Sequence, residues 1–455
     1  MNKETRIAKI KEVMDRNPEP FAKEEIVWED SLQTMPVYKI PLENLVYNKY
    51  NGRILTRTKS LEAQGQDIDV ESREGKELIE RLLWESKLDR NKGTGADIER
   101  FGQKKVGIIT ADGIIIDGNR RAMLLNRGNR FDYFKAIVLP VTLEQNPLEI
   151  EKLETSYQMG EDEKLGYNPI EKYLKSQNLR DKGVPVEDIA GWMNESISEI
   201  EKYIRTMEIM DEYLETFNYD KMYTQLDGRE DLFLSVEKWT HYLYGETSAK
   251  GFDGYTDDDV DDLKFIAFDY IRADYEGKEF RVLAEGNKEK HFFGDRDIWL
   301  DFKNKHLQSI GPIKSEEEPI HMDSLDLEKS LKDRDVRFRG RVIDLLKANV
   351  KEHQEKLGNR QYADQPDKLI SKAIEAVKVA QANKNVGKEE VLDKVDELSD
   401  LTLSIMRKQS PVMLLREINT WLESIAADSL GEDKESARAE LKKIQSTAYH
   451  LDKDM

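Results

Sequence analysis

The stretch from residue 108 to 125, "IITADGIIIDGNRRAMLL", constrains the fold of this chain more than any other segment. Two short β-branched runs flank Ala-Asp-Gly, a sequence typical of a β-hairpin turn. The second run ends at Asp117 and a glycine, and an apolar pattern with helical spacing follows at once and stops at Gly128. Because the first backbone N–H groups of a helix lack partners within the helix, Arg120 and Arg121 beside them predict an anion-binding turn.

Strands and helices alternate around this junction. The segments "MPVYKIPLENLVYN" and "FKAIVLPVTL" predict strands. The segment "REGKELIERLLWESK" has leucine and isoleucine at helical spacing and predicts a helix, whereas "RNKGTGADIERFGQ" predicts a glycine-containing loop. This alternation predicts an α+β domain over residues 31–145, preceded by an N-terminal helical extension over residues 1–30.

Downstream of this domain the sequence pattern becomes almost entirely helical. Asn168 is placed to cap a helix that begins at Pro169 and ends at Gly183. In the next segment, a break at residues 194–196 separates two apolar helical patterns, as in a helix-turn-helix. We therefore predict a helical domain with a helix-turn-helix over 146–215, a helical linker domain over 216–330 and a C-terminal helical bundle over 331–455.

Charge and composition exclude several classes of function. The net charge of −20 at pH 7 argues against indiscriminate binding to nucleic acid. The chain has no cysteine, which excludes disulfides, thiolate catalysis and zinc–thiolate sites. No apolar run approaches the roughly 18 residues of a membrane helix, and the first residues lack the apolar core of a signal peptide. We therefore expect a cytoplasmic protein with no membrane partner.

The order of these parts resembles the ParB/sulfiredoxin-like superfamily, in its ParB branch, over roughly residues 31–215. In that family a Gly-x-x-Arg turn holds a nucleoside triphosphate, and this chain has Gly-Asn-Arg-Arg at the corresponding place. The family's Asn-Pro-x-Glu helix start is matched by residues 168–171, and Arg53 in "YNGRI" stands where the family often has a phosphate-binding arginine. The resemblance implies CTP or ATP as the ligand, leaves room for Mg²⁺, and implies a nucleotide site made of Arg53, Asp117, Gly118, Asn119, Arg120 and Arg121.

Two departures from the family pattern bear on hydrolysis. Members that bind CTP usually carry Gly-Glu-Arg-Arg, whereas Asn119 stands at the acidic position here. They also carry a Glu-Asn-x-x-Arg box, whereas this chain reads "LETSYQMGEDEKLGYNP", in which Glu154 and Glu161 are the acidic candidates and no arginine follows. Of these two, Glu154 is the candidate catalytic residue. Because metal-assisted hydrolysis needs a well-placed carboxylate, the pattern favours binding over turnover.

Each of these residues also has a purely structural explanation. Arg120 and Arg121 could pair with surface carboxylates of an acidic protein. Asp117 could accept backbone N–H bonds as a helix cap, and we expect this role rather than catalysis. The two glutamates lie in an acidic stretch that a solvated helix face would explain equally.

The predicted helix-turn-helix offers Lys202 and Arg205 as DNA contacts. Glu195, Glu199 and Glu201 lie where a phosphate backbone would approach and would repel it. We expect a structural or protein-contact role for this element in preference to sequence-specific DNA binding.

The remaining sequence suggests assembly rather than chemistry. The six histidines show no pairing at helical spacing, so we expect no histidine metal site. The acidic run at residues 257–262 lacks EF-hand spacing and predicts a solvated loop and helix cap. Apolar residues beyond residue 333 exceed what one bundle needs, which predicts a homodimer or a complex with a partner protein through the C-terminal helices. This excess is concentrated on Leu414, Leu415, Ile418, Trp421, Leu422 and Ile425.

Two function classes follow from the sequence. The first is a ParB-like module, gated by a nucleoside triphosphate, that acts on DNA or in a DNA-associated assembly, for example in a mobile-element or phage-defence locus. The second is a nucleotide-dependent enzyme of the same fold, namely a nuclease, an NTPase such as a CTPase or ATPase, or a kinase. We favour the gated module, because the only catalytic carboxylate that the sequence offers is Glu154.

Overall fold

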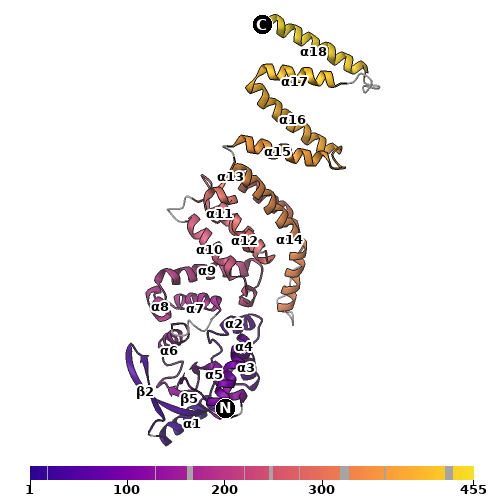
Figure 1. Cartoon of the computed structure of the whole chain (residues 1–455). Coiled ribbons are helices and arrows are strands. Elements are labelled where there is room, and N and C mark those ends of the chain that lie inside the picture. Colours follow the sequence, from indigo (N-terminus) through magenta and orange to yellow (C-terminus); the bar gives the residue numbers. More distant parts are fainter. Residues whose placement is uncertain are drawn as a thin grey trace. The chain divides into compact units, whose positions relative to one another are not determined.

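The computed structural model describes residues 1–17, 19–128, 130–160, 168–219, 221–244, 250–275, 277–317, 327–362, 365–425 and 434–455. The chain divides into two compact units, Met1–Gln361 and Tyr362–Met455. The described residues are mostly helical, and their five-stranded sheet lies in the N-terminal unit (Figure 1). The predicted α+β class is therefore confirmed. None of the helices in these ranges is long and apolar enough to span a membrane.

The sheet has the strand order β1-β2-β5-β3-β4. Neighbouring strands are antiparallel, except that β3 and β5 run parallel. Consecutive residues of the β3–β4 hairpin point to opposite faces, so Ile109 and Ile115 lie in one hydrophobic core while Ile108 and Ile116 lie in another. The strands are β1 (Ala22–Trp28), β2 (Ser31–Pro41), β3 (Gly107–Ile109), β4 (Ile115–Asp117) and β5 (Tyr133–Val138).

Helices cover both faces of this sheet. Ile79 and Leu124, from α3 and α5, pack in the same core as Ile109, whereas Ile150 and Leu153 of α6 pack in the core on the other face. The junction between β4 and α5 is therefore held from both sides. The helices of this part are α1 (Lys3–Arg16), η1 (Leu42–Asn44), α2 (Leu55–Ala63), α3 (Arg73–Ser86), α4 (Leu88–Phe101), α5 (Asn119–Gly128), α6 (Pro147–Thr155) and the π-helical η2 (Ser156–Gly160).

The rest of the N-terminal unit is helical and is built around two further cores. The larger contains Tyr213, Phe268 and Trp299, and the smaller contains Leu179 and Ile189. The long helix α14 runs along α11 and α13 (Figure 1). The helices are α7 (Pro169–Asp181), α8 (Val186–Met193), α9 (Ile197–Thr216), η4 (Tyr223–Leu226), α10 (Glu230–Tyr244), α11 (Asp257–Arg272), α12 (Gly277–Phe280), η5 (Arg281–Leu283), η6 (Lys288–Lys290), η7 (Phe292–Gly294), α13 (Arg296–Ser315) and α14 (Leu327–Arg360).

Several predicted helix boundaries are confirmed. Asn168 caps α7 by accepting a hydrogen bond from Ile170 N at 3.2 Å. Asn194 ends α8 in the left-handed conformation, and α9 begins after Ser196, so the predicted break between two helices is present. The acidic run at residues 257–262 opens α11 as predicted, with a capping box in which the side chain of Asp259 takes part.

Three predictions about the elements are wrong. Residues 22–28 form strand β1 rather than part of a helical extension, because Ile26 and Trp28 alternate into a core of the sheet. The predicted loop at 90–103 is mostly helix α4, whose buried Ile98 packs in the core beside α3 and α5 despite the two glycines. The predicted bundle does not begin at residue 331, because α14 buries one side in the N-terminal unit.

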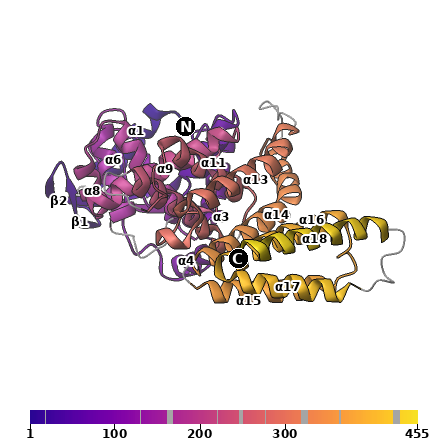
Figure 2. The same ribbon diagram turned by 90° about the horizontal axis from the view of Figure 1, so that it is seen from above.

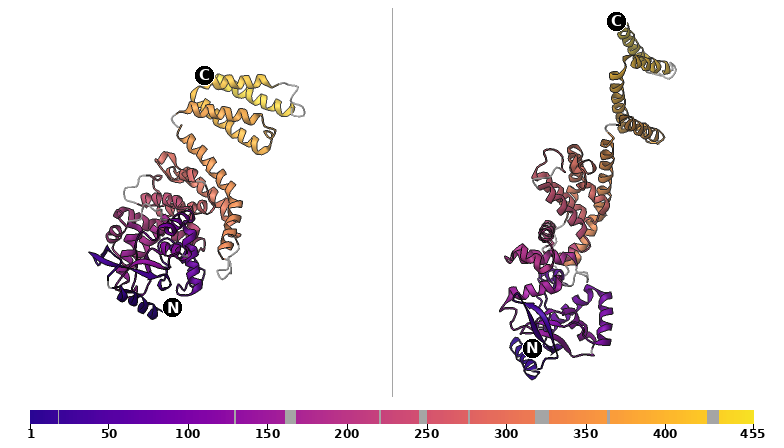
Figure 3. Two further views of the ribbon diagram at one scale, coloured as in Figure 1. Left: turned by 60° about the horizontal axis from the view of Figure 1, so that its bottom comes forward. Right: turned by 60° about the vertical axis from the view of Figure 1, so that its left-hand side comes forward.

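The C-terminal unit consists of four helices that follow one another along the chain (Figures 2 and 3). Ile370, Ile374 and Val377, which lie at helical spacing in the predicted bundle, are about half exposed, and Trp421 is 48% exposed. No residue that the structure describes in these four helices is buried. This unit therefore lacks an apolar core of its own among the described residues. The helices are α15 (Pro366–Gln381), α16 (Glu389–Gln409), α17 (Pro411–Ser424) and α18 (Lys434–Asp454).

Candidate anion-binding site

A cavity of about 450 Å³ opens at the turn between β4 and α5. Among the described residues, its lining includes one carboxylate, Asp117, and the cationic side chains of Arg53, Arg90, Lys105, Arg120 and Arg121. Several cationic side chains around a cavity of ligand size match the charge of a polyvalent anion. We call this the basic cavity, and its composition makes it a candidate site for a polyvalent anion.

Gly118 allows the chain to turn from the strand directly into the helix. Its φ of +106° lies in the region that favours glycine. A Cβ atom at this position would lie 2.6 Å from Cζ of Phe134, which is fully buried in the sheet. The turn therefore needs glycine, and it places the first backbone N–H groups of α5 beside Arg120 and Arg121.

Arg120 is held by α4, the helix that we predicted as a loop. Its Nε donates to Oδ1 of Asn91, a fully buried residue of α4. The side chain of Asn91 in turn donates to the carbonyl oxygens of Leu83 and Trp84, at 2.9 and 2.7 Å. This chain of hydrogen bonds fixes Arg120 from the end of α3, and the same helix α4 brings Arg90 to the cavity.

Asp117 forms an ion pair rather than the helix cap that we predicted. Its Oδ2 accepts from Nη2 of Arg121 at 2.5 Å, and both side chains are largely buried. The spacing of four residues and the sharp turn at Gly118 bring the two groups together. This pair orients Arg121 at the wall of the basic cavity.

Both polar atoms of the Asn119 side chain form hydrogen bonds with the protein backbone. Its Nδ2 donates to the carbonyl oxygen of Ile115 at 3.0 Å, and its Oδ1 accepts from the backbone N–H of Asn48 at 2.9 Å. The amide thus attaches the loop before α2 to the start of α5. A carboxylate could not donate the first of these bonds, which gives a structural reason for an amide at this position.

Glu154, the candidate catalytic residue, is buried behind the cavity and does not line it. Its Oε1 accepts from Nδ2 of Asn48 at 2.9 Å and from Nε2 of Gln158 at 3.0 Å, and Lys175 Nζ lies 3.8 Å from Oε2. Burial raises the pKa of Glu154. Glu161, the other acidic candidate, lies outside the described residues.

Gln158 is a lining residue that the sequence analysis missed. Its Nε2 donates to Ile116 O at 2.9 Å, and its Oε1 accepts from Gly52 N at 3.1 Å. Gln158 therefore connects strand β4 to the residue before Arg53. The sequence alone could not reveal this role, because Gln158 lies in η2, far along the chain from both Ile116 and Gly52.

Arg53 also lines a second cavity, of about 340 Å³, which we call the mixed cavity. Glu171 and Asn168, from the predicted Asn-Pro-x-Glu motif, line it as well. The structure thus brings that motif to a cavity that Arg53 also lines. The other residues that line the mixed cavity are Thr56, Arg57, Ser86, Lys87, Pro169, Asp227, Gly228 and Glu230.

Glu171 gives a testable pH dependence. It is 3% exposed, and burial raises its pKa well above the ordinary value of 4.5. Its contribution to stability is therefore present at acidic pH and is lost as the pH rises through the folded-state pKa. We expect Glu171→Gln to raise Tm at pH 8 but to change it little at pH 4.5. Scanning calorimetry at both values measures this, and a gain confined to pH 4.5 would contradict it.

No family model, curated protein or solved structure matches this chain. The assignment of the basic cavity therefore depends on its own residues and geometry.

The predicted DNA contacts Lys202 and Arg205 line another cavity, of about 530 Å³, between α9 and α10. Nε of Arg205 donates to Oε1 of Glu237 on α10 at 2.8 Å, and Lys202 Nζ lies 3.3 Å from Glu199. This face of α9 is therefore turned toward α10, and carboxylates neutralise both cations.

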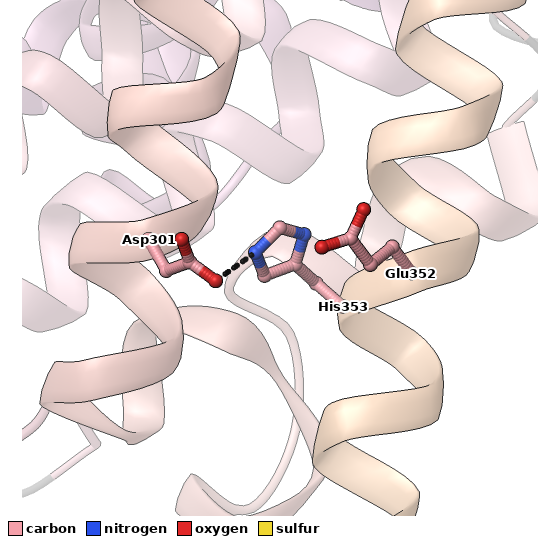
Figure 4. Close-up of side chains that lie close together, drawn as sticks. All are labelled: Asp301, Glu352 and His353. Atoms are coloured by element: carbon pink, nitrogen blue, oxygen red, sulfur yellow. Dashed lines mark hydrogen bonds and ion pairs between the residues drawn. The ribbon is translucent and has the colours of Figure 1, made fainter. Parts of the chain in front are cut away.

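The tertiary structure brings one histidine close to two carboxylates that are not its neighbours at helical spacing. Asp301 of α13 and Glu352 and His353 of α14 converge (Figure 4). Nδ1 of His353 donates to the carbonyl oxygen of Asn349 at 2.8 Å, and its Nε2 lies 3.2 Å from Oδ2 of Asp301. These groups have the chemistry of metal ligands.

Two lysines already neutralise this cluster. Lys356 pairs with both Asp301 and Glu352, and Lys305 also pairs with Glu352. The two ammonium groups lower the pKa of Glu352 to about 2. The cluster therefore acts as a salt-bridge network that joins α13 to α14.

Proposed function

We propose that the N-terminal unit binds a nucleoside triphosphate, CTP or ATP, with its phosphates in the basic cavity. The observation that carries this proposal is the gathering of five cationic side chains at a strand-to-helix turn, where the described lining residues include one carboxylate. Phosphate oxygens match arginine guanidinium groups and the N–H groups of a helix start. Asp117 is the lining carboxylate that would face a Mg²⁺ ion carried by the nucleotide.

We further propose that the chain is a divergent ParB-like module that is gated by this nucleotide and acts on DNA or in a DNA-associated assembly, for example in phage defence. The motifs at residues 118–121 and 168–171 support the resemblance, and both border cavities that contain Arg53. A ligand that spans these cavities would contact both the sheet part and the helical part of the unit.

The alternative is a nucleotide-dependent enzyme of the same fold: a nuclease, an NTPase or a kinase. Glu154 argues against it, because this carboxylate is 7% exposed and is engaged by Asn48 and Gln158 behind the cavity. Asp117 is paired with Arg121. Neither arrangement leaves a carboxylate ready to activate water, so binding with little or no turnover is the preferred function.

Calorimetric titration of the full chain with CTP, ATP and GTP, with and without Mg²⁺, tests the proposal. We expect saturable binding of at least one triphosphate at a stoichiometry of one per chain. If none of them binds, the proposed function is wrong. Phosphate release measured on the same samples separates the gated module from a hydrolase.

For DNA, we expect affinity for random duplex at about 0.15 M salt to be poor and to be nearly unchanged by Lys202→Ala or Arg205→Ala. The reason is that Glu199 and Glu237 already pair with these cations. Fluorescence anisotropy with labelled duplex measures this. A tight, sequence-dependent complex that Arg205→Ala abolishes would show that α9 reads DNA.

We propose that a second copy of this chain covers the C-terminal helices. Leu415, Ile418 and Trp421 lie along one side of α17 and Ile425 follows at its C-terminal cap; each is between 37% and 53% exposed. Half-exposed large apolar side chains continue on α15, α16 and α18, and two identical surfaces of this kind can bury each other around a two-fold axis.

Light scattering is expected to show a dimer at tens of micromolar for the full chain and a monomer for the double variant Ile418→Glu/Trp421→Glu. Thr420→Glu, on the opposite side of α17, adds charge without touching this stripe and should remain dimeric. A truncation should end at Gln361 rather than near Lys332, because α14 buries Phe338, Val342 and Leu346 in the N-terminal unit. A monomeric full-length chain would disprove the dimer.

A further inference from the structure

The basic and mixed cavities share Arg53 but differ in charge. Among the described residues, five cationic side chains and one carboxylate line the basic cavity. The described lining of the mixed cavity has three cationic side chains and three carboxylates, together with the hydroxyl groups of Thr56 and Ser86 and the amide of Asn168. A nucleotide has the same asymmetry, because its phosphates are anionic whereas its base and sugar are neutral and form hydrogen bonds.

We propose that the mixed cavity holds the nucleoside of the nucleotide whose phosphates occupy the basic cavity, and that it selects a base with an exocyclic amino group. This inference rests on the proposed function. Arg53, which lines both cavities, lies at the boundary between phosphate and nucleoside. The volume of about 340 Å³ is within the range of ligand pockets.

The carboxyl groups of the mixed cavity provide the selectivity. Glu171 is almost fully buried, and the hydrogen bond that it accepts from Thr56 Oγ1 is long, at 3.4 Å. In its ionised form Glu171 only accepts hydrogen bonds, so an amino group would donate to it, whereas a carbonyl oxygen in the same place would face another oxygen. Because a buried polar group that loses its partner is costly, a site of this kind discriminates strongly against the analogue that lacks the donor.

Asp227 supplies a second acceptor at the exposed side of the cavity. Nδ2 of Asn168 donates to its Oδ1 at 3.2 Å, which joins the start of α7 to the turn after η4. The remaining carboxylate oxygen of Asp227 can accept a further bond. The cavity thus presents acceptors from two separate elements to one ligand.

Titration of the full chain at pH 8 with inorganic tripolyphosphate and with two matched nucleotide pairs tests this inference. CTP and UTP differ by an amino group in place of a carbonyl, and so do ATP and ITP. We expect tripolyphosphate to bind more weakly than the preferred nucleotide, and the amino-bearing member of at least one pair to bind about tenfold or more tightly than its partner. Equal affinity within both pairs would overturn the inference.

Two variants locate the selectivity. Glu171→Leu and Asp227→Ala should each reduce the ratio of affinities within the discriminating pair, and a ratio is unaffected by any general loss of binding. Asp227 is exposed, so its variant tests the cavity even where a buried substitution disturbs folding. An unchanged ratio in Asp227→Ala and in folded Glu171→Leu would overturn the inference.

The two proposals fail separately. If tripolyphosphate binds as tightly as every nucleotide, the basic cavity holds phosphate but the mixed cavity does not hold a nucleoside. If neither tripolyphosphate nor any nucleotide binds, both the proposed function and this inference are wrong.

Discussion

Arg121→Ala and Arg120→Ala are each expected to weaken binding of the preferred triphosphate by about tenfold to a hundredfold. A charge-assisted hydrogen bond to phosphate contributes roughly 1.5 to 3 kcal/mol, which corresponds to that loss. Both side chains line the basic cavity and are held in place, Arg120 by Asn91 and Arg121 by Asp117. Little of their binding energy is therefore lost in ordering them on binding. Calorimetric titration measures the change.

Arg127→Ala is the matched control for this prediction. Arg127 lies on the same helix α5, is exposed, and stacks over the ring of Trp84 at 4.3 Å rather than lining the cavity. Its removal lowers the net charge by the same amount but should change the affinity by less than about twofold. Equal losses in all three variants would mean that the protein's overall charge, and not the basic cavity, attracts the nucleotide.

Asp335→Ala is expected to lower the free energy of unfolding by about 3 to 5 kcal/mol, the usual result of removing one partner from a buried ion pair. Arg272, which is 2% exposed, donates from Nε to Asp335 at 2.9 Å, and its other nitrogens hold Glu317 at 2.7 and 2.9 Å. The hydroxyl group of Tyr219 donates to Asp335 at 2.5 Å. The substitution would remove the acceptor of Arg272 Nε and of the Tyr219 hydroxyl group in the core that α11 and α14 share. Urea unfolding at pH 7 measures the loss.

Glu316→Ala provides the comparison for this second effect. Glu316 pairs with Arg341 of α14 at 2.6 Å, but both side chains are about half exposed or more. Solvent screens such a pair, so its removal should lower stability by less than about 1 kcal/mol. If the two variants lost similar stability, burial would not be what makes the Arg272–Asp335 pair important.

The local elements of the fold could be predicted because their signals lie close together in the sequence. The hairpin at residues 107–117, the turn at Gly118 and the start of α7 at Asn168 each depend on a few neighbouring residues. The spacing of hydrophobic residues also predicts helices and strands from neighbouring positions in the chain. Arg120 and Arg121 were assigned to an anion site for this reason, and both line the basic cavity.

The sequence predictions are wrong where contacts with other elements outweigh local preference. The glycines at 93 and 95 favour a loop, but Asn91 and Ile98 are buried against α3 and α5, and that packing makes the segment helical. Residues 22–28 are a strand because β2 pairs with them over their whole length. The stabilising contacts of both segments come from other elements, a neighbouring strand for residues 22–28 and also the distant helix α5 for α4, so the pattern within each segment cannot contain them.

By itself the sequence determined the strand–turn–helix junction, the α+β class and the basic character of the turn at Gly118, because backbone geometry and hydrophobic spacing are local properties. Only the tertiary structure decided that Arg90 and Gln158 line the cavity, that Glu154 lies behind it, and that Arg53 adjoins two cavities. Cavities and burial arise when segments distant in the sequence pack together, and the charge of a site depends on which of their side chains meet.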